Sequence, residues 1–157
     1  CGVTARVIPT LRDPEAADRR LAEALLEAKA DLVILSGYLR RLGPATLAAF
    51  AGRILNIHPG PLPDFGGEGM YGRHVHEAVI AAGLPASEIC VHVVDAVYDH
   101  GPVLARLSVP VEAGDTAETL EQRVTAAEPA FFVETLRAIA DGRLALPSGP
   151  DRAKSGA

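Results

Sequence analysis

The chain has 157 residues, of which 48% are hydrophobic and 22% are charged, ordinary values for a globular domain. This length allows one domain that buries roughly 70% of the surface of its unfolded chain. The 15 basic and 20 acidic side chains give a net charge of −5, so no broad field is expected that would attract nucleic acid or an anionic membrane. With 4% aromatic residues and no tryptophan, a base-stacking surface is not expected either.

The cysteine content indicates a reducing compartment. Cys1 and Cys90 are too few for a disulfide framework, and no Cys-x-x-Cys motif is present. We therefore expect a cytoplasmic location. The sequence contains no secretory or lipidation signal, and no apolar run reaches the roughly 18 residues that a membrane helix needs.

The first predicted elements alternate between helix and strand. Asp13 followed by Pro14 predicts a helix start, because Asp caps helix N-termini and Pro fits the first turn. The apolar run at residues 31–36 predicts a central parallel strand that is buried on both faces. A helix at residues 44–51 and a second buried strand at residues 53–57 are predicted next.

The rest of the chain predicts a loop rich in Pro and Gly, a helix, two strands and a long final helix. This helix begins near Asp115, where Glu118 at the N3 position suggests a capping box, and Gly142 suits its C-terminal cap. Pro129 is expected to kink or split the helix, because proline removes a backbone donor. The predicted ranges are 59–69 for the loop, 71–82 for the first helix, 88–94 and 102–109 for the strands, and up to residue 141 for the long helix.

Strands that alternate with helices predict an α/β fold with a largely parallel sheet flanked by helices. We expect residues 1–146 to form one domain and the polar residues 147–157 to be a flexible tail. In such sheets, ligand sites form outside the carboxyl ends of the strands. Candidate site residues therefore lie in the segments that follow three predicted strands, residues 36–41, 56–63 and 95–101.

Asn56 and His58 are the strongest candidates for catalysis. They are two residues apart at a strand end, so their side chains point to the same side. The amide of Asn56 can donate to a developing oxyanion, and His58 can exchange a proton near neutral pH. From these two residues alone, a strand-end cap for Asn56 and a hydrogen-bonded loop position for His58 are the better explanation.

Asp99 is the third candidate. A carboxylate near His58 would raise the pKa of the imidazole and keep it protonated, and it can accept a proton directly or through water. An ordinary turn acid in Asp-x-Gly is the alternative.

Several other polar residues give weaker indications of a functional role. His92, on a predicted strand, suggests support behind the site, whereas His74 and His76 are wrongly spaced for a metal pair on a helix. A metal ion held by His58, His74 and Asp99 is not expected. Arg40 or Arg41 could meet an anionic or pterin-like ligand, or both could be solvated. Glu128 could hold ribose hydroxyls or be a surface acid.

Taken together, the sequence resembles the glycinamide ribonucleotide formyltransferase family from Gly2 to about Leu144. The pairing of Asn-x-His with Asp-x-Gly-Pro, in this order, is specific enough that chance convergence is not expected. The resemblance rests on Leu35-Ser36-Gly37-Tyr38-Leu39-Arg40, Gly52-Arg53-Ile54-Leu55-Asn56-Ile57-His58-Pro59, Gly72-Arg73-His74-Val75-His76, Val91-His92-Val93-Val94, Asp99-His100-Gly101-Pro102-Val103, Gly114-Asp115-Thr116, Arg123-Val124, Glu128 and Asp141-Gly142-Arg143-Leu144.

The resemblance implies a Rossmann-like formyltransferase fold and a folate-dependent activity of purine synthesis. The family transfers a formyl group from 10-formyltetrahydrofolate to the amine of glycinamide ribonucleotide, without a metal. It implies that Asn56, His58 and Asp99 are catalytic, with His92 behind them. It also implies that the folate contacts Leu39, Arg40, Leu42, Asp95, Val97 and Tyr98, and that Pro59, Gly60 and Glu128 contact the amine substrate.

The sequence departs from the family pattern in two places. We expect it to begin about one βαβ unit inside the family's domain, without the Gly-Ser-rich loop that binds the substrate phosphate. Residues 66–70 resemble a short insertion that could adjust the amine substrate. The alternatives are a sister enzyme that acts on another amine, such as a nucleotide sugar, and a catalytically silent fragment that binds folate. The expected partners are small molecules, and a homodimer is possible.

Overall fold

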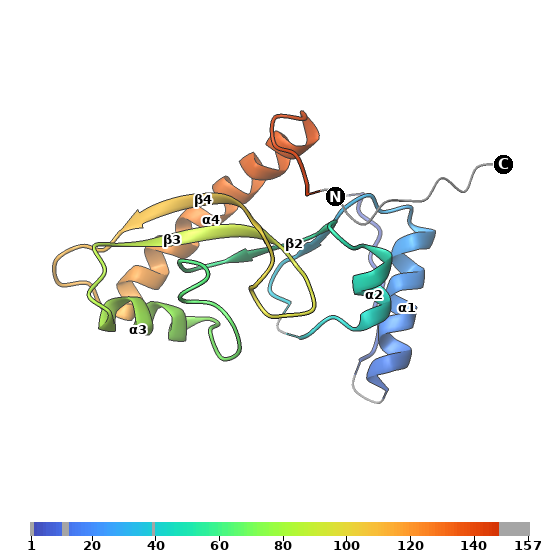
Figure 1. Ribbon diagram of the computed structural model, residues 1–157, viewed down its shortest axis with the longest axis horizontal. Helices are drawn as coiled ribbons and strands as arrows, with labels where there is room; N and C mark the ends of the chain where they lie inside the picture. Colours follow the sequence, from blue (N-terminus) through green and yellow to red (C-terminus); the bar gives the residue numbers. More distant parts are fainter. Residues whose placement is uncertain (1, 11–12, 39, 148–157) are drawn as a thin grey trace.

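The computed structural model describes residues 2–10, 13–38 and 40–147. Within these ranges, four strands form one sheet, and the four helices lie on its faces and at one end (Figure 1). Of the predicted tail, residues 148–157 lie outside the described part, and a domain boundary at residue 146 stays a prediction. In chain order the elements are α1 (Pro14–Glu27), β1 (Val33–Leu35), α2 (Pro44–Ala49), β2 (Ile54–His58), α3 (Arg73–Ala81), β3 (Ala86–Val93), β4 (Val103–Pro110) and α4 (Ala117–Ala140).

The sheet is mixed, with the strand order β1-β2-β3-β4. β1 and β2 are parallel, but β2 pairs antiparallel with β3, and β3 pairs antiparallel with β4. The α/β class is therefore right, and the prediction of a largely parallel sheet is wrong for the described strands. The loop at residues 94–102 contains no helix, and a parallel pair needs a longer crossover, so β3 and β4 must run in opposite directions.

β1 lies at an edge of the described sheet, so the prediction of a central strand is wrong. Its side chains are only partly buried, and Ile34 is 42% exposed. An apolar run alone does not distinguish an edge strand from a central one, because pairing depends on distant segments.

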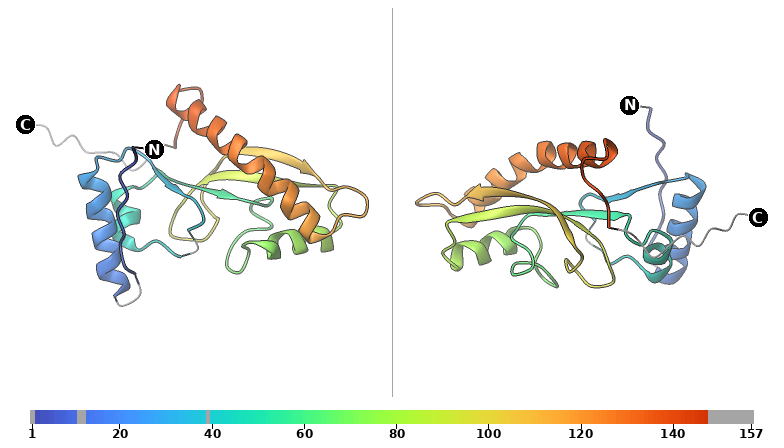
Figure 2. Two further views of the ribbon diagram at one scale, coloured as in Figure 1. Left: turned by 180° about the vertical axis from the view of Figure 1, so that it is seen from behind. Right: turned by 45° about the horizontal axis from the view of Figure 1, so that its top comes forward.

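α4 packs across one face of the sheet (Figure 2). Phe131, Phe132 and Leu136 of α4 pack against a cluster that contains Val91 of β3. The helix runs unbroken through Pro129, so the predicted split is wrong. This packing offsets the backbone hydrogen bond that proline removes.

The N-terminal cap of α4 also differs in detail from the prediction. The capping box is formed by Thr116 and Thr119, and Glu118 has no part in it. At the other end, Asp141 is the C-cap residue, and Gly142 follows it with a φ of +71°, as a helix C-terminus favours. No helix in the described ranges is both long and apolar enough to cross a membrane.

α1 and α2 lie together beside the β1 side of the sheet (Figures 1 and 2). Asp18 of α1 joins them, because its carboxylate accepts hydrogen bonds from the backbone N–H groups of Ala45 (2.7 Å) and Thr46 (3.1 Å). These groups belong to the first turn of α2, which has no side-chain cap from its own N-cap residue, Gly43. A side chain at Gly43 would collide with Asp18, so this glycine permits the close approach. The contact holds α2 and therefore the segment that precedes it.

Replacing Asp18 with Ala should lower the free energy of unfolding by about 1–3 kcal/mol, because two N–H groups of α2 lose their acceptor in a buried position. Urea denaturation measures the effect. Glu23→Ala, at an exposed position of the same helix, is the control and should change stability by less than about 0.5 kcal/mol. Equal losses in the two variants would contradict the capping role.

Candidate active site

The register between β2 and β3 places two predicted site residues side by side. Asn56 lies opposite His92, and the Nδ2 atom of Asn56 is 3.2 Å from Nε2 of His92. The Nδ1 atom of His92 is 3.1 Å from the carbonyl oxygen of Val93, which can only accept, so Nδ1 carries a proton. In its neutral form His92 therefore accepts from Asn56 through Nε2. This contact fixes the direction of the Asn56 amide.

His58 ends β2 and is almost fully buried, at 3% exposure. Its Nε2 atom is 2.7 Å from the carbonyl oxygen of Phe65, so Nε2 carries the proton of the neutral ring. Its Nδ1 atom is 3.5 Å from Oδ2 of Asp99. The sequence placed His58 and Asp99 in separate segments, and the fold brings them together.

Asp99 is held from three directions. Its Oδ2 accepts a hydrogen bond from the backbone N–H of Gly67 at 3.1 Å and faces His58, while its Oδ1 is 3.4 Å from Nε2 of His92. Its backbone has a φ of +53°, a left-handed conformation that Asp and Asn tolerate better than most residues. Close packing behind the loop requires Gly101, since a side chain there would collide with the carbonyl of Val93.

The protonation of His58 differs from the prediction. Burial lowers the pKa of His58, and the charge of Asp99 and the Phe65 carbonyl raise it by less, so the pKa lies below its ordinary value of 6.5. The prediction that Asp99 keeps His58 protonated is therefore wrong for the protein without ligand. Asp99 acts in the predicted direction, but desolvation of the ring is the larger effect.

At the Asp99 carboxyl, neighbouring groups affect the pKa more than burial does. Burial alone would raise its pKa, but the His92 ring that faces Oδ1, the charge that His58 carries when it is protonated and the N–H of Gly67 outweigh burial. The pKa of Asp99 therefore lies below its ordinary value of 3.8. At neutral pH the site holds an ionised carboxylate beside a neutral imidazole, a pair that can take up one proton.

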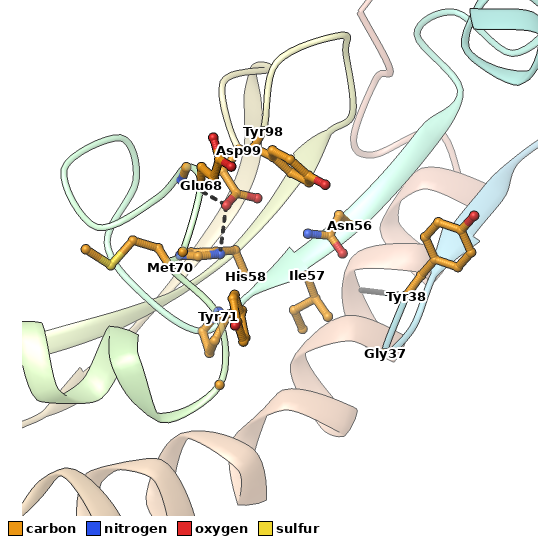
Figure 3. A pocket seen from close by; sticks show the side chains of 14 residues that line it. Gly37, Tyr38, Asn56, Ile57, His58, Glu68, Met70, Tyr71, Tyr98 and Asp99 are labelled. Atoms are coloured by element: carbon orange, nitrogen blue, oxygen red, sulfur yellow. Dashed lines mark hydrogen bonds and ion pairs between the residues drawn. The ribbon is translucent and has the colours of Figure 1, made fainter. Parts of the chain in front are cut away.

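Asn56, His58 and Asp99 line one cavity of about 290 Å³ (Figure 3). Tyr38, which follows β1, lies across the opening from His58. The remaining wall is the loop before α3, whose Gly67, Gly69 and Gly72 all have positive φ. The lining residues are Gly37, Tyr38, Asn56, Ile57, His58, Pro59, Gly67, Glu68, Gly69, Met70, Tyr71, Gly72, Tyr98 and Asp99.

A second, smaller cavity adjoins the first, and it contains the described residues predicted to contact folate. Its walls are the segment after Tyr38 and the loop after β3. The two cavities share the side chains of Tyr38, Asn56, Tyr98 and Asp99. The second cavity is lined by Leu35, Tyr38, Arg40, Arg41, Leu42, Asn56, His92, Val94, Asp95, Ala96, Val97, Tyr98 and Asp99. Leu39, also predicted there, lies outside the described residues.

Two predicted residues are not in the lining of either cavity. Gly60 is buried behind His58, where a side chain would collide with Val75. Glu128 lies on α4, and burial raises the pKa of its carboxyl. Within the described ranges, no group of three or more His, Cys, Asp or Glu residues is arranged to hold a metal ion.

Other lining residues were missed by sequence reasoning. Glu68, Met70 and Tyr71 all belong to the loop before α3 (Figure 3). The available signal was the apparent insertion at residues 66–70, which identified the loop but no residue in it. Tyr38 belongs to a motif that carries the family resemblance, but that motif indicates no role for its side chain.

Comparisons with known proteins agree with this geometry. The family model described as formyl transferase matches residues 4–136, and the chain belongs to this family. It is 42% identical over 144 residues to a chloroplastic phosphoribosylglycinamide formyltransferase of Vigna unguiculata, covering 87% of this chain and 46% of the relative. It is 38% identical over 130 residues to the Escherichia coli phosphoribosylglycinamide formyltransferase, covering 83% and 59%.

Solved structures of the family have the same Rossmann-like fold. A phosphoribosylglycinamide formyltransferase from Coxiella burnetii superposes with a TM-score of 0.80 at 32% identity, covering 91% of this chain and 66% of that chain. Glycinamide ribonucleotide transformylase 1 from Symbiobacterium toebii gives 0.76 at 38% identity, covering 88% and 63%. The chain spans about half the length of the two curated relatives named above.

The electrostatic balance at His58 can be measured by NMR titration. Its imidazole should titrate with a midpoint below 6.5, and Asp99→Asn should lower the midpoint further, because the variant removes the charge that raises the pKa. Asp31→Asn, on the exposed segment before β1, is the control and should leave the midpoint unchanged. A midpoint that rises in Asp99→Asn would contradict the assigned pairing.

Proposed function

We propose that this chain transfers the formyl group of 10-formyltetrahydrofolate to the amine of glycinamide ribonucleotide, a step of purine synthesis. The observation that supports this proposal most directly is that Asn56, His58 and Asp99 line the same cavity. The names of the relatives supply the reaction and the acceptor substrate. Asn56, His58 and Asp99 are the proposed catalytic residues, with His92 positioning the amide of Asn56.

The first step is attack of the substrate amine on the formyl carbon. A new carbon–nitrogen bond forms, and the formyl oxygen becomes an oxyanion. One N–H of Asn56 is engaged by His92, which leaves the second N–H to donate to this oxygen. An amide fixed before the reaction does not need to reorient as charge develops.

The proton that the attacking amine loses is taken up by the pair of His58 and Asp99, whose Nδ1 and Oδ2 atoms are 3.5 Å apart. His58 starts neutral, and the nearby oxyanion favours its charged form as the intermediate builds up. The carbon–nitrogen bond to folate then breaks, and the proton passes to the leaving folate nitrogen. Formylated amine and tetrahydrofolate result, with no proton gained or lost overall.

The two adjoining cavities suit two substrates. The smaller one contains the folate contacts that we propose, Arg40, Leu42, Asp95, Val97 and Tyr98. The larger one, with Pro59 in its lining, takes the amine substrate. Asn56 and Asp99 belong to both linings, which is where a group passing between two substrates must react. We also propose that Gly60 and Glu128 contact the amine substrate, although neither residue lines either cavity.

The proposal also covers the partners of the chain and its need for a metal. The expected partners are the two small-molecule substrates, and no metal is required. A cytoplasmic location and a homodimer stay predictions, and the Vigna unguiculata relative is named as a chloroplastic protein.

The decisive experiment follows the absorbance change on deformylation of 10-formyltetrahydrofolate, with and without glycinamide ribonucleotide. Amine-dependent transfer that persists in EDTA supports the proposal. Folate turnover without amine would indicate hydrolysis instead, and transfer to a nucleotide sugar amine alone would replace the acceptor. Folate binding without turnover would favour a silent fragment.

Asp99→Asn should reduce kcat by roughly 10²–10⁴-fold, because the amide cannot accept the amine's proton, and should leave folate affinity within about threefold. Asn also tolerates the positive φ at this position. Steady-state kinetics and equilibrium binding of a folate analogue measure the two effects. Asp64→Asn, an exposed change outside the lining of this cavity, should keep full activity. Unchanged turnover in Asp99→Asn would remove Asp99 from the mechanism.

A further inference from the structure

We propose that Arg41 is a positioning residue that holds together the two walls of the smaller cavity and thereby sets the affinity for the folate co-substrate. This inference rests on the proposed function, which places the folate in that cavity. No role for Arg41 follows from the sequence motifs, because either arginine of the Arg40-Arg41 pair could be solvated.

The side chain of Arg41 bridges the two walls of the smaller cavity. Its Nη2 atom donates a hydrogen bond to the carbonyl oxygen of Ala96, and its guanidinium carbon lies 5.8 Å from the ring centre of Tyr98. Ala96 and Tyr98 belong to the loop after β3, whereas Arg41 belongs to the segment after β1. A single side chain thus joins segments that are 55 residues apart in sequence.

Arginine is well suited to this pair of contacts. Its planar guanidinium donates several hydrogen bonds from its edge and can also lie over an aromatic ring. Lysine can replace the hydrogen bond but not the planar face. The neighbouring Arg40 makes no such bridge within the described part of the chain.

The bridge orders the wall before the ligand arrives. The cavity measures about 60 Å³, and one of its walls is the loop that Arg41 contacts. Without Arg41, binding would have to order the loop at the expense of affinity.

Asp99 does not depend on Arg41 for its position. Its carboxylate has its own contacts with Gly67, His58 and His92. Removing Arg41 therefore loosens the cavity wall and leaves the proton-accepting group in place. The expected signature is a change in KM for folate without a matching change in kcat.

Steady-state kinetics of Arg41→Met should show KM for 10-formyltetrahydrofolate about tenfold higher, with kcat and KM for the amine within twofold. The folate KM of Arg41→Lys should lie between those of Arg41→Met and wild type, because lysine keeps a hydrogen-bond donor. Arg19→Met removes an arginine that forms an exposed ion pair with Glu15 on α1, and it should match wild type. An unchanged or lower folate KM, or a loss confined to kcat, would overturn the proposal.

Hydrogen exchange tests the bridge without any turnover. In the ligand-free protein, amides of residues 95–98 should exchange about tenfold faster in Arg41→Met than in wild type or Arg19→Met. Equal exchange would refute the bridge even if kinetics differed. If the wild-type protein transfers no formyl group, the proposed function fails, while the exchange result still decides whether Arg41 holds this loop.

Discussion

The antiparallel pairing of β2 with β3 is the constraint on which the site depends. It sets Asn56 opposite His92, and it starts the loop after β3 next to Leu55, so that this loop folds back over the end of β2. A one-residue slip would turn every side chain of one strand to the other face and separate Asn56 from His92. The apolar contacts of Val91 with α4 oppose such a slip. The apolar packing on one face of β3 thus fixes the positions of the polar side chains on its other face.

Burial and charge act against each other at His58 and Asp99. The ring of His58 is buried deeply enough that desolvation outweighs the carboxylate beside it, whereas Asp99 has enough donors around it to stay ionised. Because His58 starts neutral, the proposed mechanism has it gain positive charge only as the amine loses its proton, when the nearby oxyanion favours the charged form.

The sequence identified Asn56, His58 and Asp99 because their residue types and spacing are specific, and the structure brings them into one cavity. The direction of β3 was not predictable from its alternation, because alternation is the same in parallel and antiparallel strands. The neutral form of His58 was also missed, since its burial comes from tertiary packing and its Nε2 partner is Phe65, seven residues away. Local patterns contain neither kind of information.

The two sides of the site are held by separate contacts. The loop before α3 is tied to Asp99 through the N–H of Gly67, and the wall of the smaller cavity is tied to the segment after β1 through Arg41. Asp99 lies where the two cavities meet, with contacts to His58 and His92 beneath it. Under the proposed function, changes in the loop at residues 66–72 would adjust the amine side without breaking the contact of Arg41 on the folate side. An insertion at residues 66–70 is consistent with this division, because it falls on the side where the acceptor would bind.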